Sequence, residues 1–139
     1  MKTICIIPAR GGSKGIKLKN LQLVNKKPLV YFPIRAAIES NVCDKVIVST
    51  DSEKIANVSK KYGAEVPFLR KKKFSKDFTT TEETLKHALK QAENYYQTKF
   101  DICVFLAATN IFRRVSWIKE AVETLKKNKE IDSAFSVHK

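Results

Sequence analysis

The chain has 139 residues, 43% of them hydrophobic, which is enough to bury the core of one domain of ordinary size. Its 27 Lys and Arg residues outnumber 14 Asp and Glu, and the formal net charge of +13 favours anionic partners such as nucleic acid, an anionic membrane or a phosphorylated small molecule. The basic residues are mostly Lys and are spread along the whole chain, a pattern equally typical of a solvated surface, and no apolar run is long enough to cross a bilayer.

The first element is a short apolar run, Thr3 to Ile7, that ends at Pro8. It has no small-residue cleavage site, so it indicates a first β-strand and not a signal peptide. The three cysteines, Cys5, Cys43 and Cys103, are odd in number and lack metal-ligand spacing. We therefore expect buried, reduced thiols in a cytoplasmic protein.

Strand and helix patterns then alternate. Residues 29–39 predict a helix, which Pro33 should delay or kink. Residues 45–49 predict a buried strand. Ser52 is a candidate N-cap for a helix that Gly63 ends, and residues 65–69 predict another short strand.

The second half continues in the same way. A basic loop spans residues 70–78, and Thr80 and Glu83 have the spacing of a capping box. An apolar stripe from Leu85 to Ala92 predicts a helix behind them. Residues 102–106 predict a buried strand, residues 115–125 a helix, and residues 133–137 a last strand.

This alternation predicts one α/β domain over residues 1–139, a three-layer fold in which a mostly parallel, Rossmann-like sheet is flanked by helices. Only His138 and Lys139 follow the last predicted strand. A sheet that ends without a covering helix indicates either that the native polypeptide continues or that the C-terminal part of the domain is absent.

The most informative segment runs from Pro8 to Asn20, directly after the first strand. It contains three of the four glycines, Gly11, Gly12 and Gly15, which let a backbone approach a phosphate closely. Three cations, Arg10, Lys14 and Lys19, could contact a triphosphate, and Asn20 could bond a ribose or phosphate oxygen. Ligands of open α/β sheets bind beyond the carboxyl ends of the strands, so the segment predicts a phosphate site. It is neither a Walker A loop nor a dinucleotide fingerprint.

The sequence Ile-Pro-Ala-Arg-Gly-Gly-Ser-Lys-Gly-Ile at residues 7–16, with Lys19 and Asn20, resembles the opening of the acylneuraminate cytidylyltransferases. These are the CMP-sialic acid synthetases and their relatives for other nonulosonic acids. The resemblance extends through Lys27-Pro28-Leu29, residues 46–52 and residues 61–70, and so covers nearly the whole chain. It implies a fold like that of the nucleotide-diphospho-sugar transferases.

The resemblance implies that CTP binds at a defined set of positions. The phosphates would contact the opening loop, and Arg70 and the segment 77–81 would read cytosine and ribose. Arg10 and Lys14 are the candidate catalytic residues, for stabilising charge on the reacting phosphate. The implied nucleotide-binding residues are Ala9, Arg10, Gly11, Gly12, Ser13, Lys14, Lys19, Asn20, Arg70, Thr79 and Thr81. Capping of the following helix is an equally good explanation for Thr80 and Thr81.

One segment departs from the family pattern. The family usually has Leu-Gln-Pro-Thr-Ser-Pro-Leu-Arg where this chain has Leu-Ala-Ala-Thr-Asn-Ile-Phe-Arg at residues 106–113. The implied sugar-binding positions are Ala107, Thr109 and Arg113. The family's Gln helps hold the acceptor sugar of the sialic acid synthetases, so Ala107 favours a different nonulosonic acid.

The implied reaction is attack of the sugar's anomeric hydroxyl on the α-phosphate of CTP, with release of pyrophosphate. Mg²⁺ is the implied cofactor, but no metal ligand is expected within this chain, because the family's metal-binding aspartates and dimer-forming segment lie further along. The 139 residues alone should therefore be inactive, and the full-length protein should be a homodimer that binds neither nucleic acid nor membrane.

Three alternative functions stay open. The first is an enzyme for 3-deoxy-manno-octulosonic acid, and the Gly-Gly-Ser-Lys-Gly loop argues against it. The others are another sugar nucleotidyltransferase and a non-catalytic nucleotide- or nucleic-acid-binding module.

Overall fold

The centre of the molecule is a parallel β-sheet. The structure is a computed structural model that describes residues 2–13, 16–17, 19–70, 81–107 and 115–127. Three strands, β6 (Lys45–Ser49), β1 (Thr3–Pro8) and β7 (Ile102–Phe105), form the sheet in that order, with β1 in the middle. Pro8 pairs with Ser49 and Ile6 with Phe105, so the carboxyl ends of the three strands lie at one edge.

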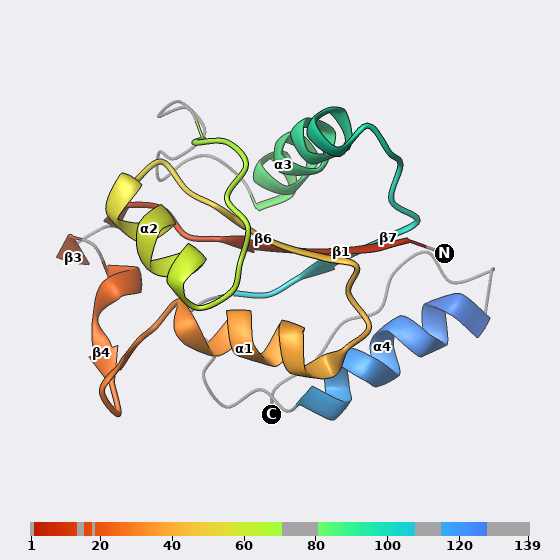
Figure 1. Ribbon diagram of the computed structural model, residues 1–139, viewed down its shortest axis with the longest axis horizontal. Helices are drawn as coiled ribbons and strands as arrows, with labels where there is room; N and C mark the ends of the chain where they lie inside the picture. Colours follow the sequence, from red (N-terminus) through yellow and green to blue (C-terminus); the bar gives the residue numbers. More distant parts are fainter. Residues whose placement is uncertain (1, 14–15, 18, 71–80, 108–114, 128–139) are drawn as a thin grey trace.

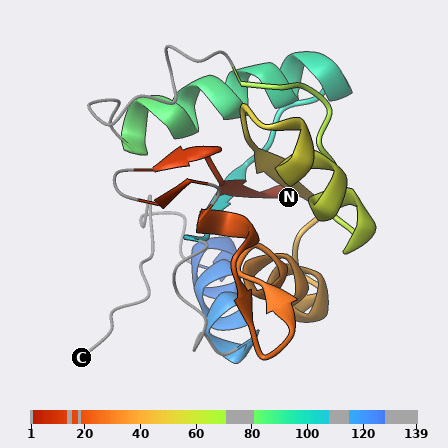
Figure 2. The same ribbon diagram turned by 90° about the vertical axis from the view of Figure 1, so that its left-hand side faces the viewer.

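Helices cover both faces of this sheet. Helices α1 (Tyr31–Ser40) and α4 (Val115–Lys127) pack on one face, and α3 (Thr81–Tyr96) crosses the other (Figures 1 and 2). Ile55 of α2 (Glu53–Lys61) joins the core on the α1 side. The predicted three-layer α/β fold with a parallel, Rossmann-like sheet is confirmed.

The path of the chain reverses at β1. The chain runs from β1 through α1 to β6, and Glu65 then adds a parallel bridge to Ile47 on β6. It next crosses the opposite face through α3 and returns as β7 on the other side of β1. In open α/β sheets, ligands bind outside the carboxyl ends of the strands at such a reversal, which here lies between β1 and β7.

Alternation along β1 divides the core into two layers. Cys5 and Ile7 point toward α1 and α4, whereas Ile4 and Ile6 point toward α3 and pack with Ala88 and Ala92. All four β1 side chains are fully buried. A strand that is apolar on both faces is the expected pattern for the centre of a sheet covered on both sides.

Several local predictions are confirmed. Helix α1 begins at Tyr31, which places Pro33 in the first turn, where a backbone N–H has no partner within the helix. The Ser52 hydroxyl accepts the Ile55 N–H at 3.3 Å and so caps α2. Gly63 follows α2 with a φ of +105°, a conformation that favours glycine. The apolar stripe of α3 faces the sheet.

Two predictions are wrong. The strand expected at residues 65–69 is reduced to the bridge at Glu65, whose N–H and carbonyl bond Val46 and Val48. Pro67 has no N–H with which to continue the ladder. The strand expected to be buried at residues 102–106 is open on one face: Cys103 and Phe105 are exposed, because α3 packs on β1 and β6 and leaves this face of β7 uncovered in the described part of the chain.

Other expectations fall outside the described residues, namely the Thr80 end of the capping box and the strand at 133–137. Among the helices that the structure describes, none is both long and apolar enough to span a membrane.

Candidate functional site

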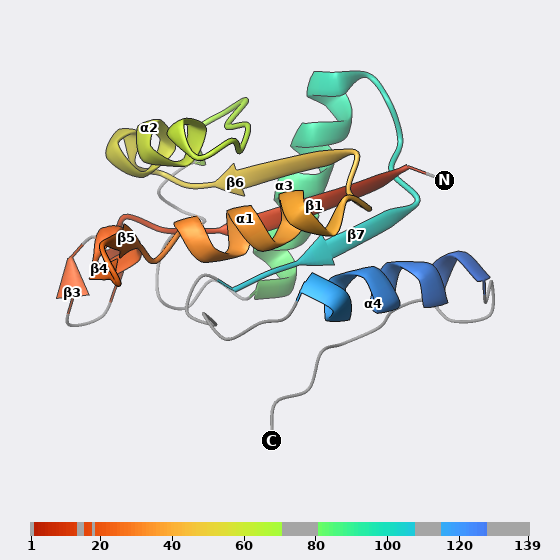
Figure 3. The ribbon, with the colours of Figure 1, turned by 60° about the horizontal axis from the view of Figure 1, so that its bottom comes forward.

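The candidate site lies where β1 and β6 end side by side. The Ala9 N–H donates to the Ser49 carbonyl at 2.9 Å, which extends the parallel pairing one residue beyond β1. The segments that follow, Arg10–Gly11 and Thr50–Asp51, therefore run next to each other at the carboxyl edge of the sheet. In Figure 3 this edge lies at the left, opposite the N-terminus. Ligands of this fold type bind at such an edge.

Gly11 packs tightly against the end of β6. Its N–H donates to Asp51 Oδ1 at 2.7 Å. A Cβ at Gly11 would lie 3.0 Å from Ser52 Cβ and 3.3 Å from Asp51 Oδ1, so a side chain here would fit only if these neighbours shifted slightly. The chain then forms a short hairpin in which β2 (Gly12–Ser13) pairs with β3 (Ile16–Lys17).

Asn20 bonds the backbone of the loop that follows β1. It belongs to the short 3₁₀ helix Lys19–Leu21, is 9% exposed, and donates from Nδ2 to the Arg10 carbonyl at 3.0 Å. Its own carbonyl accepts the Val30 N–H at 3.0 Å, which ties the loop to the start of α1. Asn20 thus fixes the backbone at Arg10, a role that sequence reasoning missed, while its contact with a ligand stays a prediction.

Arg70 is brought to the same place from a distant part of the sequence. Its N–H donates to the Thr50 carbonyl at 2.7 Å, and the residue is only 5% exposed. Burial lowers the pKa of Arg70, Asp51 opposes this by stabilising the cation, and Arg10 lowers the pKa further by repulsion. Arg10, Asp51 and Arg70 therefore interact electrostatically at the ends of β1 and β6.

The carboxyl edge of the sheet thus brings two guanidinium groups, those of Arg10 and Arg70, near one carboxylate, that of Asp51. A guanidinium can bond two phosphate oxygens at once, so the two arginines are candidates for binding a phosphate. Asp51 was not among the predicted site residues. Its position directly after a strand that neighbours β1 was the signal that could have identified it.

The remaining predicted residues have different outcomes. Ala9 is buried, so it can offer only its backbone, and Lys19 is half-buried beside Asn20. Ala107 follows β7, whose end is paired to β1 through the Leu106 N–H and the Ile6 carbonyl at 3.3 Å. It therefore lies on the side of β1 opposite β6. Thr81 is the first residue of α3. Lys14, Thr79, Thr109 and Arg113 lie outside the described residues.

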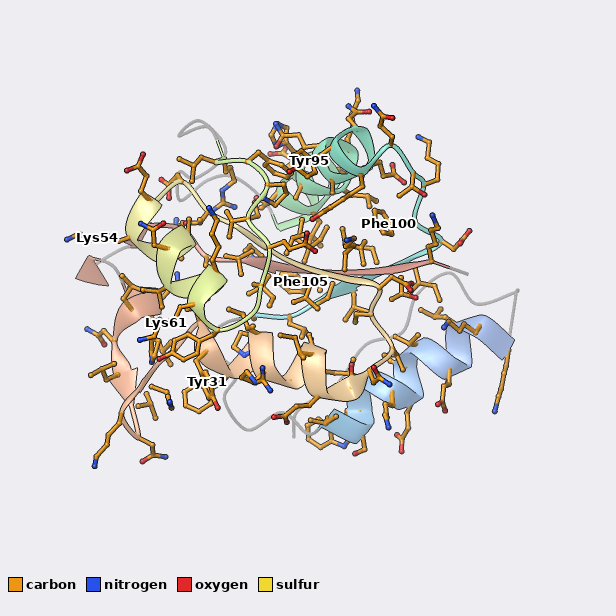
Figure 4. All side chains as sticks on the ribbon, in the orientation of Figure 1. Tyr31, Lys54, Lys61, Tyr95, Phe100 and Phe105 are labelled. Atoms are coloured by element: carbon orange, nitrogen blue, oxygen red, sulfur yellow. The ribbon has the colours of Figure 1, made fainter. Side chains whose placement is uncertain are left out.

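A cluster of aromatic rings and lysines joins the start of α1 to the end of α2. The rings of Tyr31 on α1 and Tyr62 after α2 meet edge to face, with centroids 5.0 Å apart. Lys27 Nζ lies 5.3 and 5.5 Å from these two centroids, and Lys61 lies 5.6 Å from that of Tyr62. Figure 4 labels Tyr31 and Lys61 in this cluster. Such contacts stabilise the packing of α1 against α2.

The part of the chain that the structure describes contains no group of three or more His, Cys, Asp or Glu side chains that could hold a metal ion. Asp51 is a poor ligand for Mg²⁺, because its Oδ1 accepts the Gly11 N–H and the charges of Arg70 and Arg10 act at the same place.

Two curated relatives resemble most of this chain. It is 36% identical over 128 residues to the pseudaminic acid cytidylyltransferase of Campylobacter jejuni, a match that covers 92% of this chain and 55% of that protein. It is 40% identical over 122 residues to the N-acylneuraminate cytidylyltransferase of Escherichia coli, which covers 88% of this chain and 28% of that protein. The chain spans about half the length of the first of these relatives.

Solved structures share the fold. The CTP complex of CMP:2-keto-3-deoxy-manno-octonic acid synthetase matches with a TM-score of 0.78 over 94% of this chain and 50% of that one, at 18% sequence identity. The sequence profile of the family described as Cytidylyltransferase matches residues 4–139. This chain therefore belongs to the cytidylyltransferase family.

Proposed function

We propose that this chain is the nucleotide-binding part of an enzyme that transfers CMP from CTP to an acidic, nonulosonic sugar. The observation that carries the proposal is the convergence of the Arg10–Gly11 loop, bonded to Asp51, and of buried Arg70, bonded to Thr50, at the carboxyl edge of the sheet, in a chain of the cytidylyltransferase family. The phosphate oxygens of CTP are anionic acceptors of the kind that guanidinium groups bind.

In the proposed reaction the anomeric hydroxyl oxygen of the sugar attacks the α-phosphorus of CTP. The new bond joins that oxygen to CMP, the bond to the β-phosphate oxygen breaks, and pyrophosphate leaves. Arg10 and Lys14 would stabilise the negative charge on the phosphate oxygens, and the backbone of Gly11 and Gly12 would position the phosphates. Arg70, Thr79 and Thr81 would contact the nucleoside. No residue is assigned as the general base.

For the acceptor we propose a nonulosonic acid other than sialic acid. Ala107 stands where the resembled sialic acid enzymes have a sugar-binding Gln, and a methyl group cannot replace the amide's hydrogen bonds. Ala107, Thr109 and Arg113 are the proposed acceptor-side residues. The two relatives carry names with different sugars, and their identities of 36% and 40% favour neither.

The remaining proposals concern the protein at the length of its relatives. We expect it to act in the cytoplasm as a homodimer, to require Mg²⁺ with CTP, and to bind neither nucleic acid nor a membrane. Nucleic-acid binding would need aromatic side chains interleaved with Lys and Arg along a groove, and the sequence lacks that arrangement.

The chain should bind CTP more tightly than ATP, GTP or UTP. The reason is that base-reading contacts discriminate only where the site forms hydrogen bonds to the base, which the segment from Arg70 to Thr81 is proposed to supply. Isothermal titration calorimetry with each of the four nucleotides and Mg²⁺ measures this directly. Equal affinities would contradict cytosine recognition and leave a general polyanion site.

The 139 residues alone should release little or no pyrophosphate from CTP. Phosphoryl transfer depends strongly on charge stabilisation by a bound metal, and the described residues contain no group of three or more His, Cys, Asp or Glu side chains that could hold one. The assay compares this chain with the protein at the length of its relatives, each with a panel containing sialic acid, pseudaminic acid, legionaminic acid and 3-deoxy-manno-octulosonic acid. Rapid turnover by the 139 residues would show that a carboxylate within them holds the metal. Efficient use of sialic acid by the longer protein would contradict the interpretation of Ala107.

A further inference from the structure

Asp51 accepts a hydrogen bond from the Gly11 N–H, and the proposed reaction assigns Asp51 no role. Its Oδ1 lies 2.7 Å from the Gly11 nitrogen, and the hydrogen bond joins residues 40 positions apart in the sequence. The carboxylate is partly buried between the first loop and the start of α2, where Ser52 caps the helix. A single side chain therefore connects the end of β6 to the loop that follows β1.

The hydrogen bond has a consequence for Arg10. Asn20 holds the Arg10 carbonyl from one side, and Asp51 holds the next N–H along the chain from the other. The peptide between Arg10 and Gly11 is thus fixed at both its oxygen and its nitrogen. Because this peptide is fixed, the Cα of Arg10 is held in place, and its side chain extends from there near Arg70. The backbone of Arg70 is itself bonded to Thr50.

We propose that Asp51 is a positioning residue of the nucleotide site. By accepting the Gly11 N–H, it fixes the loop so that Arg10 and Arg70 can bind the same anion. The inference rests on the proposed function for the identity of that anion, CTP. It assigns Asp51 no contact with the nucleotide, since a carboxylate repels phosphate.

Two substitutions at this position separate the hydrogen bond from the general loss of a side chain. Asp51→Ala removes the acceptor, whereas Asp51→Asn keeps one acceptor oxygen and replaces the other, charged oxygen by a neutral NH2 group. The chain offers a matched control in Asp44, whose Oδ2 accepts the Thr3 N–H at 2.7 Å at the opposite end of β1. Asp44→Ala removes a bond of the same kind, far from the candidate site.

We expect Asp51→Ala to weaken CTP binding about tenfold, which corresponds to the loss of one well-made hydrogen bond. Asp51→Asn should bind within about threefold of the parent, because the acceptor is kept. Asp44→Ala should bind CTP like the parent while losing thermal stability to a similar extent as Asp51→Ala. Calorimetric titration with CTP and thermal unfolding, applied to all four proteins, give these numbers.

Amide hydrogen exchange at Gly11 reports the loop without any nucleotide. The Gly11 amide should be protected in the parent and in Asp51→Asn and should exchange faster in Asp51→Ala. Faster exchange without weaker CTP binding would overturn the positioning role and leave the proposed function intact. Equal weakening in Asp51→Asn and Asp51→Ala would also overturn it, because charge and not the acceptor would then matter. Failure of the parent to bind CTP at all would instead overturn the proposed function.

Discussion

Arg10→Ala is expected to weaken CTP binding by about 1.5–3 kcal/mol, the contribution of a hydrogen bond to a charged group, or about 10- to 150-fold in Kd. The structure favours a large effect because Asn20 and Asp51 fix the backbone on both sides of the Arg10–Gly11 peptide. A cation held in position loses little conformational freedom when it binds a phosphate. We expect a similar loss for Lys14→Ala.

Folding should be little affected by the same substitution. Arg10 and Arg70 repel each other, so the loss of one charge should change the free energy of unfolding by no more than about 0.5 kcal/mol. Lys119→Ala, on the exposed surface of α4, is the control for the reduced net charge. Calorimetry at two salt concentrations separates a specific contact from the general field of the protein. If Arg10→Ala and Lys119→Ala bind CTP equally well, the loop does not bind the phosphates.

The order of the elements could be predicted from the sequence because each signal is local. The apolar run at 3–7, the Ser52 cap and Gly63 each determine structure within a few residues, and all three are confirmed. The strand at 65–69 was mispredicted because its composition is apolar, whereas its pairing depends on where Pro67 falls in the ladder. The exposure of Cys103 depends on which strands α3 covers, and this is a property of the packed fold that the strand's own sequence does not contain.

The site could be predicted in part for the same reason. The glycines and cations after β1 are contiguous in sequence, so their chemistry was visible directly. Arg70 was identified only through the family resemblance, because its contact with Thr50 depends on the path of the chain after α2. Asp51 and the supporting role of Asn20 depend on hydrogen bonds between segments, 40 residues apart in one case and 10 in the other. A single sequence does not show which distant residues will form hydrogen bonds with each other.

Ile6→Ala is expected to destabilise the fold by about 2–5 kcal/mol, the usual range for truncating a fully buried isoleucine. Ile6 is in the central strand, has no exposed surface, and packs with Ile4, Ile47 and Ala88 under α3. Removal of its side chain leaves a cavity that the sheet cannot close, because β1 is paired on both sides. A loss of this size is a large fraction of the total stability of an ordinary domain, about 5–15 kcal/mol.

The control is Leu23→Ala, since Leu23 on the β4 strand (Leu23–Val24) is 70% exposed and should change stability by no more than about 0.5 kcal/mol. Ile6→Val removes a single methylene and should lie between the two, at about 0.5–1.5 kcal/mol. Urea unfolding followed by circular dichroism gives all four free energies, and an unchanged m-value shows that the same surface is exposed on unfolding. Equal losses in Ile6→Ala and Leu23→Ala would mean that α3 does not pack over the centre of the sheet.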